Sequence, residues 1–167
     1  MVKDKIIGFI PKVVIDDENY AIFVTTKRLV FILTGKARVL LGYLLGGALG
    51  AFIARETAKD DFDFSDFDLD AKLAEDKKNM VFMIKWITEV KLKREWGSFY
   101  PIKIYGLNAK DKVVKLISGY FVLPKEMKRY YLQSGYKEKE ILTHYARTNQ
   151  DILVSALGDK VTVRYFL

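Results

Sequence analysis

The chain has no cysteine, one histidine and three prolines in 167 residues. The lack of cysteine excludes disulfides, thiolate metal sites, iron–sulfur clusters and cysteine nucleophiles. The single histidine, His144, has no other potential ligands at the spacing of a metal site. The sequence also lacks a nucleophile-elbow motif whose serine a histidine could activate. Phosphate-binding loops of the G-x-x-x-x-G-K and G-x-G-x-x-G kinds are also absent. These absences favour a non-catalytic protein that holds neither a metal nor a cofactor.

Half of the residues are hydrophobic and 29% are charged, a composition typical of one globular domain with its own core. Near the start, Pro11 and Lys12 interrupt the apolar run, and no small-x-small cleavage site follows. We therefore expect a cytoplasmic protein, with peripheral attachment to a membrane left open.

The net charge of +7 is unevenly distributed. Residues 56–76 hold nine acids and two lysines, whereas residues 77–139 hold fifteen lysines or arginines and five acids. This asymmetry indicates either an anionic partner or an acidic arm that folds back on a basic body. A calcium loop starting at Asp61 would need glycine and glutamate where Asp66 and Lys72 stand, so we expect no metal there.

The hydrophobic pattern predicts strands at residues 6–15, 20–26, 28–34, 80–85, 87–95, 101–107 and 112–118. In residues 87–95, charged side chains alternate with Val90 and Leu92, which is the period of a half-exposed strand. A short amphipathic helix is predicted around residues 125–133, a second helix from about Lys137 towards Gly158, and a last strand at residues 161–167.

The segment NYAIFVTTKRLVFILTGK, with Thr25-Thr26-Lys27-Arg28-Leu29 at its centre, resembles a hairpin of pleckstrin-homology-like domains of the prokaryotic, GRAM-like kind. The glycine-rich insert and the run KNMVFMIKWITEVKLKRE are similar to relatives of the same group, and the resemblance covers about residues 5–133. It implies an α+β, mainly β fold: a bent antiparallel barrel of seven strands, capped by the helix at residues 125–133. Residues 1–135 would form this barrel, with an insertion at 38–79, and residues 136–167 would add a helix and a strand.

One departure from the family bears on function. Pleckstrin-homology domains that bind phosphoinositides are typically rich in lysine and arginine around the first loop, but here that loop is Asp16-Asp17-Glu18-Asn19. Acidic side chains repel a phosphorylated head group, so phosphoinositide binding is not expected at this loop.

Residues 39–54, VLLGYLLGGALGAFIA, carry no charge and precede an acidic arm at 56–76. Gly42, Gly46 and Gly50 recur every fourth residue, so on a helix they would form a groove that admits another helix backbone. Sixteen residues span roughly 24 Å, less than the ~30 Å hydrocarbon core of a bilayer. Packing within the protein, packing against a second copy and shallow membrane insertion all stay open.

From these patterns we predict a non-catalytic binding module that associates peripherally with a membrane or with a protein partner. The predicted contacts with anionic surfaces are Arg28, Lys91, Lys93 and Arg94. The predicted hydrophobic contacts are Gly42, Leu45, Gly46, Leu49, Gly50 and Phe52. The alternative is a homo-oligomeric scaffold that uses the glycine row as a helix interface. The tail strand could also pair with a sheet edge of another copy, and nucleic acid is not an expected partner.

Overall fold

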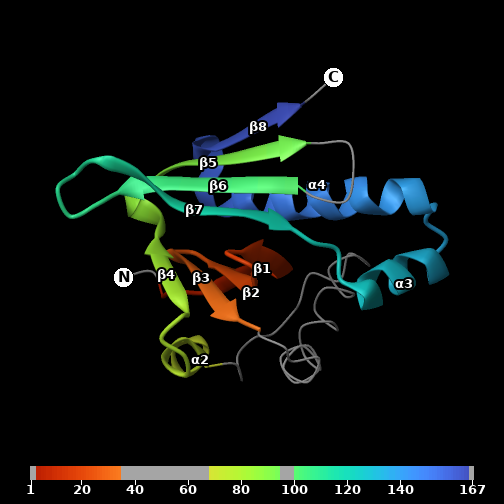
Figure 1. Cartoon of the computed structure of the whole chain (residues 1–167), viewed down its shortest axis with the longest axis horizontal. Helices are drawn as coiled ribbons and strands as arrows, with labels where there is room; N and C mark the ends of the chain where they lie inside the picture. Colours follow the sequence, from red (N-terminus) through yellow and green to blue (C-terminus); the bar gives the residue numbers. More distant parts are fainter. Residues whose placement is uncertain (1–2, 35–67, 95–99, 166–167) are drawn as a thin grey trace.

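The computed structural model describes residues 3–34, 68–94 and 100–165 of the chain (Figure 1). The strands are β1 (Ile6–Ile15), β2 (Glu18–Thr25), β3 (Arg28–Leu33), β4 (Met80–Met83), β5 (Ile87–Arg94), β6 (Tyr100–Leu107), β7 (Val113–Phe121) and β8 (Val161–Tyr165). The helices are α2 (Leu69–Ala74), α3 (Lys125–Gln133) and α4 (Glu138–Leu157), with short 3-10 turns at Ile84–Trp86 and Gly158–Lys160.

The eight strands form one mixed sheet in the order β4-β3-β2-β1-β7-β6-β5-β8. Neighbours pair antiparallel except for β5 and β8, which run parallel. The predicted α+β, mainly β class is therefore confirmed, but the sheet is mixed and is not closed. The tail strand β8 pairs with β5 of its own chain and forms one edge of the sheet.

Tight turns set the register of the first half of the sheet. Asp16 and Asp17 both have positive φ (49° and 64°) and link the paired residues Ile15 and Glu18, as a two-residue hairpin turn requires. At the next turn the Thr25 hydroxyl accepts hydrogen bonds from the backbone N–H of Lys27 (3.2 Å) and Arg28 (2.9 Å). The ends of the predicted strands near Asp16 and Lys27 are thus set by the local conformation and hydrogen bonds of these two turns.

The two halves of the sheet meet where β1 pairs with β7, at Val13↔Phe121 and Val14↔Tyr120. The register of β1 against β2 shifts between Ile10 and Val13, so the strand is irregular just before this seam. At Gly119 the strands approach so closely that a Cβ would lie 2.4 Å from the Val14 carbonyl oxygen. The seam therefore needs glycine at position 119.

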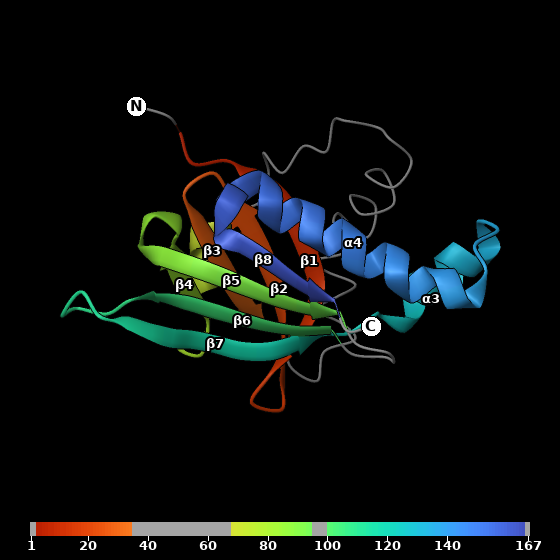
Figure 2. The same ribbon diagram turned by 90° about the horizontal axis from the view of Figure 1, so that it is seen from above.

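The main core lies between the two halves of the bent sheet and the C-terminal helices. In Figures 1 and 2, α4 runs behind β5, β6 and β7 and alongside β1. Five fully or almost fully buried α4 side chains join this core: Ile141, Tyr145, Ile152, Leu153 and Leu157. The α3 helix adds Met127 and Tyr131. The predicted helices are confirmed, and the later one contributes more core residues than the helix expected to cap the barrel.

Strands β1 to β3 are buried on both faces. Alternate residues Phe9, Ala21, Phe23, Val30 and Ile32 form a second apolar cluster, to which Leu69 of α2 belongs. The α2 helix begins after Asp68, whose carboxylate accepts a hydrogen bond from the Ala71 N–H (3.0 Å). Residues 69–74 of the expected acidic arm are therefore helical and supply leucines to a core.

Candidate functional site

The outer face of the β5–β8 half differs from that of β1–β3 because it carries charge. Val90 and Leu92 of β5 point into the main core, so Glu89, Lys91 and Lys93 lie on the opposite face. This alternation confirms the half-exposed strand that the sequence predicts. Figure 1 views this half from the side opposite α4.

Cross-strand pairing brings further basic residues beside those of β5. Lys91 pairs with Lys103 of β6 and with Thr162 of β8, and Lys93 pairs with Arg164 of β8. Paired residues share a face of the sheet. On β7, the exposed Lys115 pairs with Tyr105 of β6, which in turn pairs with Glu89. We call the surface formed by Lys91, Lys93, Lys103, Lys115 and Arg164 the cationic face.

One acid of β5, Glu89, stands on the same face as these basic residues. The Glu89 carboxylate lies 3.5 Å from the Lys91 ammonium and accepts a hydrogen bond from the Thr162 hydroxyl (3.3 Å). The Lys91 ammonium also lies 5.0 Å from the centre of the Tyr105 ring. Like charges that stand opposite one another on neighbouring strands are destabilising. The Lys91–Lys103 pair therefore carries a stability cost that an anionic partner would relieve.

Arg28 lies elsewhere, at the start of β3, and is held by two carboxylates. Its guanidinium contacts Asp4 and Asp70, each at 2.7 Å. The hydrogen bond to Asp70 is the main cause of the raised pKa of Arg28, and burial partly opposes it. Burial acts to raise the pKa of Asp4, but hydrogen bonds from Thr25 and Arg28 outweigh it and the pKa is lowered. An anionic ligand at Arg28 would have to displace both carboxylates.

The other predicted contacts fall at or beyond the limits of the described chain. Arg94 is the last residue of β5. The predicted hydrophobic contacts Gly42, Leu45, Gly46, Leu49, Gly50 and Phe52 lie outside the described residues. The structure thus brings together Lys91 and Lys93, and it keeps Arg28 apart from them.

Arg164 is a member of the cationic face that the sequence-based prediction missed. The alternation in VTVRYFL could have placed Thr162 and Arg164 on the polar side of the tail strand. What the pattern could not supply is the parallel pairing of β8 with β5, because that pairing joins residues about 70 positions apart.

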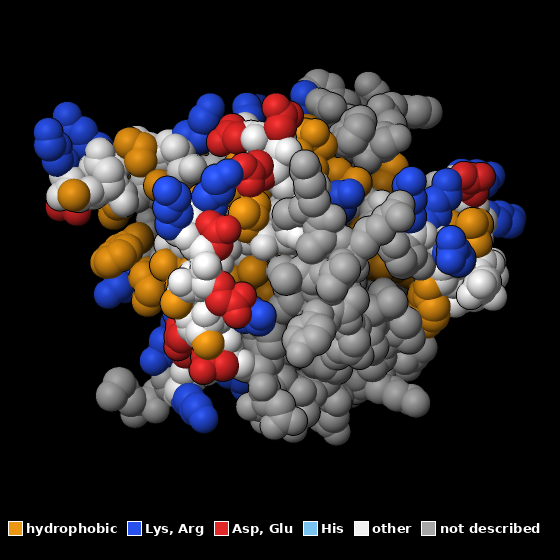
Figure 3. Space-filling view, turned by 60° about the horizontal axis from the view of Figure 1, so that its bottom comes forward, with side chains coloured by type: hydrophobic (Ala, Val, Ile, Leu, Met, Phe, Trp, Pro, Cys, Tyr) orange, Lys and Arg blue, Asp and Glu red, His pale blue; other side chains and the backbone are white. Residues whose placement is uncertain are grey.

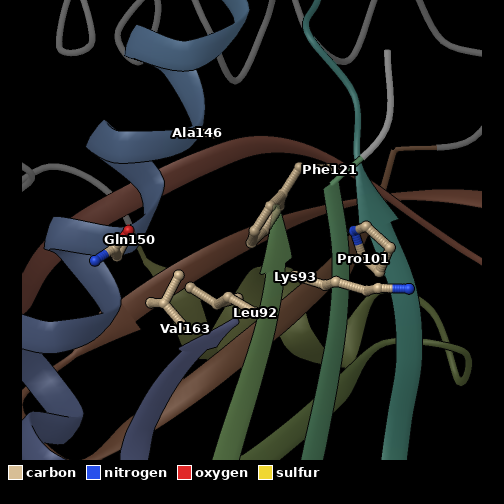
Figure 4. A pocket seen from close by; sticks show the side chains of 7 residues that line it. All are labelled: Leu92, Lys93, Pro101, Phe121, Ala146, Gln150 and Val163. Carbon is tan, nitrogen blue, oxygen red and sulfur yellow. The ribbon is translucent and has the colours of Figure 1, made fainter. Parts of the chain in front are cut away.

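A small hollow lies between α4 and the end of the β5–β8 half (Figure 4). Its lining residues are Leu92, Lys93, Pro101, Phe121, Ala146, Gln150 and Val163. In Figure 4 the Lys93 side chain runs across the sheet beside Pro101. The hollow measures about 20 Å³, which is room for about one water molecule. It is too small for an organic ligand or substrate.

None of the helices in residues 3–34, 68–94 and 100–165 is both long enough and apolar enough to span a bilayer. In the same part of the chain, no three or more His, Asp or Glu side chains gather in a way that could hold a metal ion. His144 instead packs its ring against Tyr131 and Tyr136, with ring centres 5.3 Å and 4.9 Å away.

Comparison of the chain with protein-family models, with curated proteins and with solved structures finds no match.

Proposed function

We propose that the chain is a non-catalytic binding module that attaches peripherally to anionic membrane surfaces through the cationic face. The observation that carries this proposal is the gathering of five basic residues on one face, where Lys91 stands opposite Lys103. An anionic surface would turn this cross-strand repulsion into attraction.

A pleckstrin-homology-like architecture is part of the proposal. It is supported by the seven antiparallel strands in the order β4-β3-β2-β1-β7-β6-β5 and by the helices that follow β7. The sheet is bent into two halves joined at the β1–β7 seam, as that fold requires. The parallel strand β8 and the long helix α4 would be additions to it.

The strength expected of such attachment follows from the number of basic residues. Each lysine or arginine close to an anionic leaflet contributes about 1 kcal/mol. Five such residues stand on the cationic face, and Glu89 offsets part of one. Binding of a few kcal/mol is therefore expected, and it should weaken as salt screens the charges over a Debye length of about 10 Å at 0.1 M.

The β1–β4 half of the described chain, residues 3–34 and 68–83, holds eight acids and eight lysines or arginines, so it carries no net charge. Asp16 and Asp17 form the β1–β2 turn, and Asp68, Asp70 and Glu75 lie in or beside α2. Figure 3, in which the bottom of the view in Figure 1 is turned forward, shows acidic and basic side chains side by side on the described surface. Because the excess positive charge lies in the β5–β8 half, that half would face an anionic leaflet.

A pair of variants with equal net charge tests the proposal. Lys91→Ala with Lys103→Ala removes two charges from the cationic face, whereas Lys125→Ala with Lys137→Ala removes two from the ends of α3 and α4. In sedimentation with vesicles of 30% phosphatidylserine, we expect the first variant to bind at least tenfold more weakly than the parent. The second should bind almost as the parent does.

Equal losses of binding in the two variants would refute the proposed site, because net charge alone would then explain the attachment. Equal binding of the parent to neutral and anionic vesicles would refute the electrostatic mechanism. Circular dichroism of each variant checks that the fold is retained.

A further inference from the structure

Trp86 is an exposed tryptophan in a firmly held turn. It ends the 3-10 turn between β4 and β5, and 54% of its surface is exposed. The Lys160 ammonium donates a hydrogen bond to the Ile84 carbonyl (2.9 Å). A Cβ on Gly106 would lie 2.8 Å from the Trp86 carbonyl oxygen, so β6 passes directly beside the turn. The fold itself therefore presents the indole to the outside.

A second exposed apolar residue lies on the neighbouring hairpin. Val113, the first residue of β7, is 61% exposed and pairs with Leu107 of β6. It stands two residues before Lys115, so it continues the cationic face towards the hairpin tip. The tip is ordered, because the Asn108 side-chain oxygen accepts hydrogen bonds from the Lys110 and Lys112 N–H groups (2.9 and 3.0 Å).

The turn and the hairpin lie at one end of the sheet. Ile87, next to Trp86, pairs with Gly106, and Gly106 pairs with Val114, next to Val113. In Figures 1 and 2 the β6–β7 hairpin projects beyond the rest of the sheet at this end. Figure 3 shows lysine and arginine side chains beside hydrophobic ones there.

Basic residues occupy the same turns as the two apolar side chains. The Lys85 ammonium lies 5.0 Å from the centre of the Trp86 ring. Lys110 and Lys112 occupy the hairpin tip, and Lys160 holds the turn. The acids in these turns are Asp111 and Asp159. Exposed tryptophan beside lysine is the combination that favours the interface of an anionic bilayer, where the ring enters the head-group region and the ammonium groups meet phosphates.

The exposed apolar area decides between a lipid and a protein partner. A half-exposed tryptophan and a valine leave on the order of 200 Å² of surface, well below the ~800 Å² that each partner buries in a stable protein complex. Insertion of one ring into a membrane interface needs no larger area.

We infer that Trp86 and Val113 form an interfacial anchor that enters an anionic membrane when the cationic face docks on it. This inference rests on the proposed function and adds to it the depth and orientation of the bound molecule. The β6–β7 hairpin and the β4–β5 turn would point into the head-group layer, and α3 would point away from it.

Tryptophan fluorescence tests the anchor directly. The chain has two tryptophans, so Trp96→Phe leaves Trp86 as the single reporter. On addition of vesicles with 30% phosphatidylserine, the emission of Trp86 should shift to the blue and should be quenched by lipids brominated near the head group. Neutral vesicles should cause neither change.

A matched pair of variants in the natural chain gives a second test that does not depend on Trp96. Trp86→Ala should weaken binding to the anionic vesicles roughly tenfold. Leu132→Ala removes another exposed hydrophobic side chain (46% exposed against 54% for Trp86) from α3, and it should leave binding unchanged.

The outcomes separate the two proposals. The anchor would be refuted if binding is salt-sensitive, Trp86 emission does not change and Trp86→Ala binds like the parent. The proposal that the cationic face binds the membrane would then be retained. Absence of binding to anionic vesicles would overturn both. Equal losses in Trp86→Ala and Leu132→Ala would also overturn the anchor, because its position at the hairpin end would then be irrelevant.

Discussion

Removal of one hydroxyl, by Tyr145→Phe, should destabilise the fold measurably. Tyr145 lies on α4, has no exposed surface, and donates a hydrogen bond to the Val122 carbonyl (3.1 Å) just after β7. The Val122 N–H in turn donates to the Lys12 carbonyl (3.1 Å), so the hydroxyl ties α4 to the seam between the two halves of the sheet. The substitution keeps the ring and removes this hydrogen bond together with the interaction of the hydroxyl with Asn149.

The expected cost follows from the loss of a buried hydrogen bond. A carbonyl left without its buried donor costs about 1–3 kcal/mol. For a chain of this length each kcal/mol corresponds to about 2–4 °C in Tm, so the variant should melt about 4–8 °C below the parent if the cost is near 2 kcal/mol. Tyr130→Phe, at a half-buried position on α3, is the matched control and should change Tm by less than about 2 °C.

The pH dependence provides an independent check of burial. Burial raises the pKa of Tyr145 above its ordinary value of 10.0, and the Asn149 side chain only partly opposes this shift. In the unfolded chain the phenol ionises near pH 10, whereas in the folded chain it stays protonated to higher pH. The stability that Tyr145 contributes is therefore complete below pH 10 and declines above it, by up to about 1.4 kcal/mol per pH unit.

Urea unfolding of the parent and of Tyr145→Phe at pH 8, 10 and 11 measures both effects. The difference in free energy of unfolding should be about 2 kcal/mol at pH 8 and should shrink at pH 11. Equal stability at pH 8, or a difference that stays constant up to pH 11, would refute the account of a buried, hydrogen-bonded phenol.

Three further predictions concern the seam, a turn and the glycine-rich run. Gly119→Ala should destabilise by about 1–3 kcal/mol in chemical unfolding, because its Cβ would meet the backbone oxygen of Val14; an unchanged midpoint would contradict the close approach. Asp17→Gly should stabilise by roughly 0.5–1 kcal/mol, because glycine adopts the positive φ of this turn without strain; a lower Tm would count against it. If the scaffold alternative holds, Gly46→Leu should lower the solution mass measured by light scattering or make the chain insoluble, whereas an unchanged mass would exclude that alternative.

Much of the fold could be predicted because its signals are local. The alternation of charged and apolar side chains predicted β5 to within one residue of its observed end. The helical spacing of apolar residues between 137 and 158 predicted α4, which spans Glu138–Leu157. The α2 helix was missed because alternating Asp and Phe dominate the preceding residues, although Asp68 three residues before Ala71 is a capping signal.

The parts that could not be predicted depend on contacts between distant residues. The eight strands were predicted, but their assembly into one open, mixed sheet depends on the parallel pairing of β8 with β5, which leaves no signal in either strand alone. The cationic face also depends on contacts between residues far apart in the sequence. The sequence shows that Lys91 and Lys93 share a strand face, but Lys103 and Arg164 join them only through cross-strand register. The carboxylates that occupy Arg28 come from residues 4 and 70, which no spacing rule connects.

Flotation of the full chain with vesicles tests the central claim most directly. The protein is mixed with neutral phosphatidylcholine vesicles or with vesicles of 30% phosphatidylserine, at 50 mM and at 500 mM salt. We predict that it floats with the anionic vesicles at 50 mM salt, that most of it is released at 500 mM salt, and that it stays at the bottom with neutral vesicles. A protein that never floats, or that floats equally with neutral vesicles, would contradict the account of the cationic face.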